Sequence, residues 1–218
     1  MSAPTAGRII TGVEDYRPVG TKGVPRPHRE QLILDAAAEE FGRYGYAGAA
    51  LSRVAAGAGV SKPLVLNYFG SKDGLYVACV ERAGANLIER IERVLSAGEP
   101  PVRMAQDTLA AIFTALRPRP HDWNVINDRT LPSDGVAQEA VQRIRTTIAD
   151  QASRGVATLA DLRALDDDDL SLLTDIWMNM VTAMVNWWLR HPASTAEEMT
   201  RRSRSVLTTI IGGLRYEG

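Results

Sequence analysis

The chain has 218 residues, of which 45% are hydrophobic and 23% charged, with a formal net charge of -1. This length allows one large domain or two small ones, and the apolar fraction suffices for a core. No run of about 18 apolar residues is present, and the N-terminus lacks an apolar signal segment, so we expect neither a membrane span nor secretion. The single cysteine, Cys79, excludes an internal disulfide and favours a cytoplasmic protein.

The charge is unevenly distributed along the chain. Residues 1–72 carry 9 basic and 6 acidic side chains, whereas residues 73–218 carry 16 and 20. This modest asymmetry allows a front that faces nucleic acid and a rear that does not. Residues 1–27 are rich in Gly, Pro and Thr and lack periodicity, which predicts a disordered arm. The arm is either a solvated tail or a basic segment that touches phosphate or the minor groove of DNA.

Residues 28–44 show the apolar spacing of an amphipathic helix that Gly45 ends. Two short helices joined by a tight turn follow within Leu51–Tyr68. Gly59 stands where the end of the first helix needs a positive φ. Ser61 can cap the second helix, and Pro63 falls in its first turn, where the missing N–H is tolerated. This is the pattern of a helix-turn-helix, which we place at residues 50–69.

The remainder of the chain also has helical periodicity. Ser71 is a suitable N-cap for a long helix over 72–97, which can act as a rod between the motif and the rear of the protein. Further helices are predicted over 102–116, 123–131, 133–159, 166–190 and from 194 or 195 almost to the end. No alternating strand pattern is found, so the sequence predicts an all-α fold of about nine helices.

An ordered set of short motifs runs through the first third of the chain. It comprises Gly45-Tyr46, Val54-Ala55, Ala58-Gly59-Val60-Ser61-Lys62, Tyr68-Phe69 and Ser71-Lys72-Asp73-Gly74-Leu75. Residues 28–75 therefore resemble the N-terminal domain of the TetR family of transcriptional regulators. The resemblance is strong over residues 28–95 and architectural beyond them. It implies a helix-turn-helix DNA-binding domain over 28–75 and a helical ligand-binding and dimerisation domain over 76–218.

The resemblance also implies a set of DNA contacts. Groove or base-edge contacts are expected from the second helix of the motif, at Lys62, Pro63, Leu64 and Asn67. Phosphate contacts are expected at its flanks, from Ser52, Tyr68 and Lys72. Ser61, the cap of this helix, belongs to the same surface. For the lysines the alternative is a solvated surface charge, and for Tyr68 it is core packing, which is compatible with an outward hydroxyl.

The chain departs from the family pattern at two places. Ala49-Ala50 stands where the family often has two threonines, one of which caps the first motif helix and touches phosphate. Leu66 stands where the family often has an aromatic residue. These changes put the cap contact in question. They favour a more apolar reading head, in which Leu64 or Val65 contacts thymine methyl groups.

The rear half contains four tryptophans and one helix with polar residues at intervals of 4, 3 and 4, namely Asp175, Asn179, Thr182 and Asn186. Polar groups at this spacing share one helix face, and a ligand site needs apolar walls with a few such groups. We therefore name Trp123, Trp177 and Asn179 as candidates for the lining of a pocket for a small apolar or aromatic effector. The alternatives are a dimer seam or ordinary core.

No catalytic, cofactor or metal motif is recognisable. G-x-S-x-G, H-E-x-x-H, a P-loop and G-x-G-x-x-G are all missing from the sequence. His28, His121 and His191 match no ligand spacing, and Asp166–Asp169 fits the acidic start of a helix better than a metal site. We therefore expect neither an enzyme nor a metalloprotein, and no cofactor.

The sequence as a whole predicts a homodimeric DNA-binding transcriptional regulator. It is expected to repress transcription from a near-palindromic double-stranded operator and to be released by a small molecule. Two alternatives remain: a DNA-binding dimer without ligand control, and an all-α enzyme in which the motif is incidental.

Overall fold

The computed structural model describes residues 25–160 and 165–213. Within these ranges the chain forms nine helices and no strand, which confirms the all-α prediction. The helices are α1 (Arg26–Gly48), α2 (Leu51–Gly57), α3 (Lys62–Phe69), α4 (Lys72–Leu95), α5 (Pro101–Leu116), α6 (Asp122–Ile126), α7 (Val136–Ala160), α8 (Asp167–Leu189) and α9 (Ala196–Gly213). Of the predicted arm, residues 1–24 lie outside the described residues, Pro25 precedes α1, and Arg26 and Pro27 begin this helix instead.

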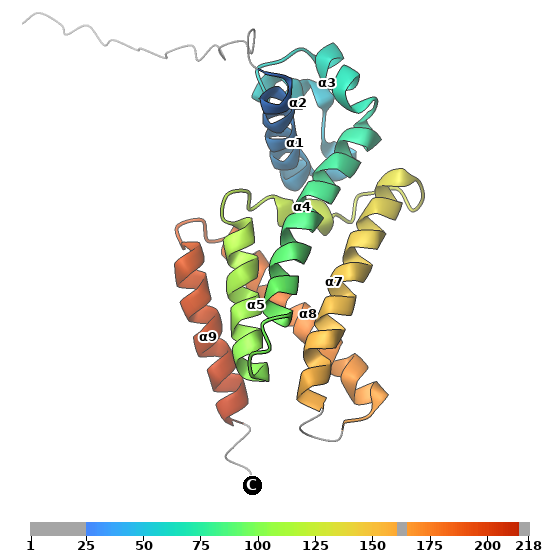
Figure 1. Cartoon of the computed structure of the whole chain (residues 1–218). Helices are drawn as coiled ribbons and strands as arrows, with labels where there is room; N and C mark the ends of the chain where they lie inside the picture. Colours follow the sequence, from blue (N-terminus) through green and yellow to red (C-terminus); the bar gives the residue numbers. More distant parts are fainter. Residues whose placement is uncertain (1–24, 161–164, 214–218) are drawn as a thin grey trace, which may run out of the picture.

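Helices α1, α2 and α3 form a small module at one end of the molecule, and α4 runs from it into the larger helical body (Figure 1). The core of this module is made by apolar side chains that α1, α2 and α3 turn inward, including Ile33, Phe41, Val54 and Val65, each at most 1% exposed. Tyr76, in the second turn of α4, packs edge-on against Phe41 in the same core. The packing of the module therefore continues past residue 75 into α4.

Helix α4 forms as its sequence predicts. The Oγ of Ser71 accepts a hydrogen bond from the Gly74 N–H at 3.0 Å and so caps the first turn. The predicted apolar stripe is buried over the first five turns of the helix. Its buried members are Leu75, Tyr76, Cys79, Val80, Ala83, Leu87 and Ile91. The same helix thus contributes to the core of the module and to that of the helical body.

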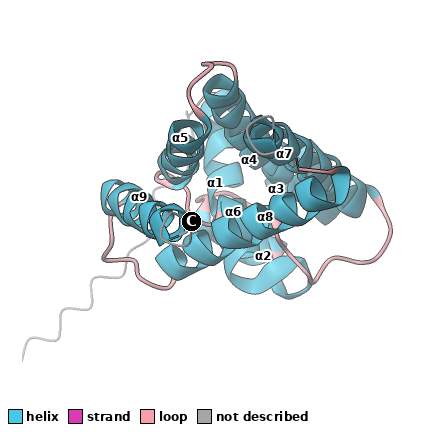
Figure 2. Ribbon diagram, turned by 90° about the horizontal axis from the view of Figure 1, so that it is seen from below, coloured by secondary structure: helices cyan, strands magenta, loops and turns pink. Residues whose placement is uncertain are grey.

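The helical body consists of α5 to α9 around the lower part of α4. Helix α5 lies between α9 and α4, and α7 lies on the other side of α4 (Figures 1 and 2). The adjacent residues Trp187 and Trp188 point in different directions, because neighbouring helical positions are about 100° apart. Trp188 is buried against Phe113, whereas Trp187 is half-buried and stacks on His191.

Some helix boundaries differ from the predicted ones. Helix α1 begins at Arg26, two residues early, because Pro25 and Pro27 are compatible with a helix start. It breaks at Gly45, as expected, but resumes and ends at Gly48. The predicted helix over 123–131 is only the five-residue α6, and α7 begins three residues late, after Gly135 at φ +98°.

Other helix ends agree with the sequence. The Asp166 carboxylate caps α8 by accepting a hydrogen bond from the Asp169 N–H at 2.9 Å, so the acidic cluster begins a helix as predicted. Thr195 and Glu198 form a reciprocal capping box at the start of α9. Among the described residues, no helix is long and apolar enough to cross a membrane.

Candidate DNA-binding surface and effector cavity

The turn between α2 and α3 has the predicted geometry. Gly59 adopts φ +64°, and the Val60 N–H donates to the Ala55 carbonyl at 2.9 Å, which closes the turn. Ser61 then caps α3 through a 3.3 Å hydrogen bond from the Leu64 N–H to its Oγ. Buried Ala55 gives the two helices room to cross closely. The motif is therefore fixed by local hydrogen bonds and by one small buried side chain.

The outward face of α3 carries most of the predicted reading residues. Lys62, Pro63 and Asn67 are exposed, and Leu64 is half-exposed. Ser52 on α2 and Ser61 at the cap are also exposed. Val65 does not share this face: it is 1% exposed and belongs to the module core, so the expectation that it contacts thymine methyl groups is wrong. Leu64 remains available for such a contact.

Tyr68 lies at the edge of this face and is partly buried. Its hydroxyl accepts a hydrogen bond from Arg29 at 3.4 Å, and the Arg26 guanidinium lies over its ring at 5.2 Å from the centroid. Two arginines of the first turns of α1 therefore stand beside the reading helix. Arg26 was expected only in an arm that either is solvated or touches DNA, and Arg29 was not predicted as a site residue, because both approach Tyr68 only through the tertiary fold.

Lys72 stands beside the α1–α2 connection. Its ammonium donates to the Ala49 carbonyl at 2.7 Å and lies 4.7 Å from the centre of the Tyr46 ring. The Tyr46 hydroxyl donates in turn to the Asp73 carboxylate. Burial and, next, this hydrogen bond to Asp73 raise the pKa of Tyr46 to about 12, so the hydroxyl keeps its proton at physiological pH. Lys72 thus has a structural partner in addition to its expected phosphate contact.

No side chain caps the first turn of α2, but a carboxylate of α1 holds the residue that precedes this helix. The Glu40 carboxylate, on α1, accepts hydrogen bonds from the Ala50 N–H at 2.9 Å and from the Arg53 guanidinium at 2.7 Å. The Arg53 side chain also donates to the Gly48 carbonyl and lies over the Tyr44 ring. Glu40, rather than a threonine at position 50, therefore holds the start of the motif.

We expect Glu40→Ala to lower the free energy of unfolding by about 1–3 kcal/mol, because it leaves the Ala50 N–H without its acceptor and Arg53 without its ion pair. Denaturant unfolding of the purified protein measures the loss. Glu39→Ala is the matched control, since Glu39 forms only an exposed pair with Arg43 and should change stability by less than about 0.5 kcal/mol. Equal losses in both variants would contradict this role of Glu40.

Helix α6 and the segment after it connect the helical body to the module. The Asn124 side chain donates to the Gly42 carbonyl of α1 at 3.0 Å. The Asp128 carboxylate accepts the Tyr46 N–H at 2.5 Å. The buried Tyr76 hydroxyl donates to the Val125 carbonyl at 2.6 Å, and burial raises its pKa well above the usual range. A displacement of α6 would therefore disturb its hydrogen bonds to both α1 and α4.

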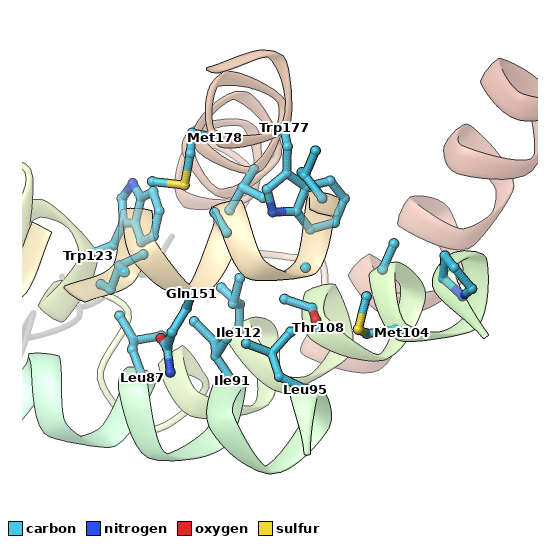
Figure 3. A pocket seen from close by; sticks show the side chains of 17 residues that line it. Leu87, Ile91, Leu95, Met104, Thr108, Ile112, Trp123, Gln151, Trp177 and Met178 are labelled. Atoms are coloured by element: carbon cyan, nitrogen blue, oxygen red, sulfur yellow. The ribbon is translucent and has the colours of Figure 1, made fainter. Parts of the chain in front are cut away.

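A partly enclosed cavity that opens to solvent lies within the helical body (Figure 3). Its walls come from five helices: Leu87, Ile91 and Leu95 of α4; Pro101, Met104, Ala105, Thr108 and Ile112 of α5; Trp123 of α6; Ile148, Gln151, Ala152, Gly155 and Val156 of α7; and Trp177, Met178 and Val181 of α8. A mostly apolar enclosure with a few polar groups has the composition of a small-molecule site.

Two of the three candidates for the pocket lining, Trp123 and Trp177, face this cavity. Asn179 does not line it: the side chain is exposed, and its amide donates to the Asp175 carbonyl at 2.8 Å. The spacing identified a polar face of α8 but not the direction in which that face points, which is toward solvent at Asp175 and Asn179. Gln151 and Thr108, which the sequence analysis did not select, supply the polar atoms instead.

Glu92 ties α4 to α7 beside the cavity. Its carboxylate accepts a hydrogen bond from the Gln151 amide at 2.9 Å and pairs with Arg154 at 2.5 Å. The hydrogen bond from Arg154, followed by that from Gln151, lowers the pKa of Glu92 from 4.5 to about 2. A carboxylate with a lowered pKa stabilises the fold fully above its ordinary pKa and loses this effect as the pH falls toward its folded value.

We therefore expect wild type to melt at a higher temperature than Glu92→Gln, and the difference between the two melting temperatures to be largest above about pH 5. The difference should shrink as the pH falls from 4.5 toward about 2. Melting curves of both proteins across this range measure it. Glu89→Gln is the control, because Glu89 pairs only with exposed Arg93 on the same helix. A difference between wild type and Glu92→Gln that is the same at all these pH values would contradict the assignment.

No group of three or more potential metal ligands occurs among the described residues. Cys79 is 1% exposed, and burial raises the pKa of its thiol to about 12, which suits a core residue. His121 is packed against Gly42, and burial lowers its pKa. These side chains serve the packing between α1, α4 and α6.

The comparison with known proteins agrees with this geometry. Residues 33–79 match the family model described as bacterial regulatory proteins, tetR family. The chain is 30% identical over 155 residues to the HTH-type transcriptional repressor SCO4008 of Streptomyces coelicolor, a match that covers 71% of this chain and 75% of that protein. This chain belongs to the TetR family. It is consequently related to helix-turn-helix regulators of transcription.

Other TetR-family relatives match in the DNA-binding part. The chain is 39% identical over 74 residues to the HTH-type transcriptional regulatory protein RaaS of Mycobacterium tuberculosis, and the match covers 34% of each protein. The chain thus spans about a third of the length of this relative. Among solved structures, FadR from Bacillus subtilis in complex with stearoyl-CoA has the same fold, with a TM-score of 0.66 and 18% identity over 84% of this chain and 98% of that one.

Proposed function

We propose that this TetR-family protein is a homodimeric repressor that binds a near-palindromic operator and leaves it when a small apolar molecule enters the cavity. The observation that carries the proposal is an exposed reading helix joined through α4 and α6 to a partly enclosed apolar cavity. Residues 28–75 would bind DNA, and residues 76–218 would bind the effector and the second subunit. Binding to chromosomal DNA places the protein in the cytoplasm.

In this proposal α3 lies in the major groove of DNA. Asn67 reads a base edge, and an asparagine amide matches the donor and acceptor of adenine. Lys62 and Pro63 contact the groove, and Leu64 contacts a thymine methyl group. Phosphates are held by Ser52, Tyr68 and Lys72 at the flanks, with Arg26 and Arg29 adding positive charge beside Tyr68.

The proposed dimer forms through α8 and α9. Their outer faces expose large apolar side chains, with Leu172, Ile176, Val206 and Ile210 each 44–60% exposed. A groove lined by Met180, Met184 and Trp187 of α8 and by Met199 and Val206 of α9 continues this surface. Apolar surface of this extent is typical of an interface. A two-fold axis here would place two copies of α3 in successive major-groove faces, about 34 Å or more apart.

Coupling between ligand and DNA would pass through α4 and α6. Trp123 lines the cavity, while its neighbours Asn124 and Val125 hold α1 and α4 through hydrogen bonds. An effector that displaces Trp123 would shift these contacts and, through α4 as a lever, the separation of the two reading helices. A coupling free energy of about 1–3 kcal/mol is enough to change operator occupancy. The solved FadR structure, which contains stearoyl-CoA, supports the view that this fold accommodates a ligand.

Retardation of a bound operator fragment, repeated across a broad panel of uncharged apolar compounds, tests the proposal. At least one compound is expected to release the DNA, and Trp123→Ala should change the concentration needed. If the fragment is bound with two-fold symmetry but no compound releases it, the proposed control by a ligand is contradicted. The protein would then be a regulator without effector control.

The roles of Asn67 and Lys72 can be separated by two variants. Asn67→Ala is expected to change sequence preference, with about 1–3 kcal/mol of discrimination lost at one base pair. Lys72→Ala should weaken binding to all sequences alike. It should also make the slope of log K against log salt concentration less steep by about the contribution of one phosphate contact. Binding isotherms on cognate and random DNA at several salt concentrations measure both effects.

Because Lys72 also donates to the Ala49 carbonyl, the melting temperature of Lys72→Ala is measured alongside. Arg93→Ala, which removes an exposed positive charge at the far end of α4, is the control and should leave DNA binding unchanged. Equal losses on cognate and random DNA for Asn67→Ala would remove Asn67 from the reading residues.

A further inference from the structure

The cavity is built for an uncharged ligand. None of the 17 described residues that line it carries a charge, and most are aliphatic, aromatic or methionine side chains. A charged group that entered this enclosure would lose its hydration without gaining a counter-ion from the walls. Selectivity must therefore come from shape and from the few polar atoms that the walls provide.

The most constrained of these polar atoms is the amide oxygen of Gln151, on α7. This residue is 2% exposed, and its amide nitrogen donates to the Ile88 carbonyl at 3.0 Å and to the Glu92 carboxylate at 2.9 Å. Both neighbours are acceptors, so exchanging the amide nitrogen and oxygen would face acceptor against acceptor. Figure 3 shows the nitrogen nearer to the α4 ribbon than the oxygen. The oxygen is thus held in a fixed direction.

No group of the described chain donates a hydrogen bond to this oxygen. The partly buried amide of Asn86, by comparison, uses both its ends: its nitrogen donates to the Ala115 carbonyl, and its oxygen accepts from Arg90. An unmatched acceptor in a buried apolar wall is unfavourable, and a ligand donor that reaches it gains a correspondingly strong interaction. Gln151 therefore keeps a fixed and unmatched acceptor within the wall of the cavity.

Trp123 provides a second unmatched group of the opposite kind. Its side chain is 7% exposed, and its indole N–H meets no acceptor within the described chain. Trp188, which is equally buried, donates its indole N–H to the Ser194 carbonyl at 2.8 Å. The cavity wall thus contains one unmatched donor, the Trp123 N–H, and one unmatched acceptor, the Gln151 oxygen.

We infer that the effector is an uncharged, largely apolar molecule with an O–H or N–H group that donates to the amide oxygen of Gln151. This inference rests on the proposed role of the cavity as the effector site and names the ligand class. A carboxylate is excluded from the same position, because it would face the amide oxygen and stand near the Glu92 carboxylate. Trp123 favours ligands whose polar groups also include an acceptor.

Three probes that share a 4-butylphenyl group test the inference: 4-butylphenol, 4-butylanisole and 4-butylbenzoate. The phenol has the donor, the methyl ether lacks it, and the benzoate adds a charge. Calorimetric titration of the full chain should show the phenol binding about tenfold or more tightly than the ether, with the benzoate weakest. In Gln151→Met, which keeps the volume but removes the acceptor, the ratio of phenol to ether affinity should fall to about one.

Because Gln151→Met also loses two bonds to α4, only the ratio within each variant is compared, which cancels general loosening of the cavity. Gln142→Met, the same substitution at an exposed position of α7 outside the cavity, is the matched control and should keep the wild-type ratio. Wild type that binds none of the probes, or prefers the ether or the benzoate, overturns the inference, as does a ratio that survives in Gln151→Met. Operator retardation by the same samples reports separately on the proposed DNA-binding function.

Discussion

Replacing Ile176 by arginine is expected to dissociate the proposed dimer into monomers and to lower operator affinity by about 10²–10⁴-fold. Ile176 lies on the outer face of α8 and is 54% exposed, so the substitution does not disturb the core of one subunit. In the proposed dimer it would bury an unpaired charge, which is strongly unfavourable. A monomer then binds each half-site alone and loses the gain from two linked contacts.

Sedimentation and DNA binding of Ile176→Arg measure these two effects together. Val136→Arg is the matched control, because Val136 is also 54% exposed but lies at the start of α7, away from α8 and α9. It should remain dimeric and bind DNA normally. A dimeric Ile176→Arg with unchanged operator affinity would show that the second subunit docks elsewhere.

The second large effect is expected from Gly74→Ala. Gly74 lies in the first turn of α4, where a Cβ would stand 2.1 Å from the Phe69 carbonyl oxygen at the end of α3. The obstacle is backbone, so relief requires α3 and α4 to move apart, and we expect a loss of roughly 3 kcal/mol in stability. Operator affinity should fall further than the loss of stability explains, because the packing of α3 against α4 fixes the orientation in which α3 is presented to DNA.

Denaturant unfolding and operator titration of Gly74→Ala test this expectation. Gly48→Ala serves as its control, since a Cβ at this helical position meets nothing closer than 3.4 Å, and such a change alters stability by about 1 kcal/mol or less. If Gly74→Ala bound the operator with wild-type affinity, the junction of α3 and α4 would not position the reading helix.

Local features of the fold could be predicted from the sequence. The caps at Ser61, Ser71 and Thr195 and the turn at Gly59 depend on residues within four positions of each other, so their chemistry is visible in the sequence. The apolar stripe of α4 follows from helical periodicity. Helical periodicity and capping also predicted α3, and two of the three residues named for the pocket lining, Trp123 and Trp177, line the cavity.

Features that depend on long-range contacts could not be predicted. Glu40 holds the Ala50 N–H before α2 from ten residues away, and Arg29 meets Tyr68 across 39 positions. The rotation of each helix about its axis is set by tertiary packing, which turned Val65 inward and Asn179 outward. The orientation of the Gln151 amide could not be predicted either, because it is fixed by two acceptors on α4 that bind its nitrogen.

Selection of bound fragments from random double-stranded DNA tests the central claim most directly, because it reports binding, symmetry and spacing in one experiment. We expect enrichment of a near-palindromic sequence whose half-sites are centred about one helical turn or more apart, roughly 34 Å. Asn67→Ala should alter the preferred base at one position in each half. Enrichment of no sequence, or of a single half-site without two-fold symmetry, would contradict a dimeric operator-binding regulator.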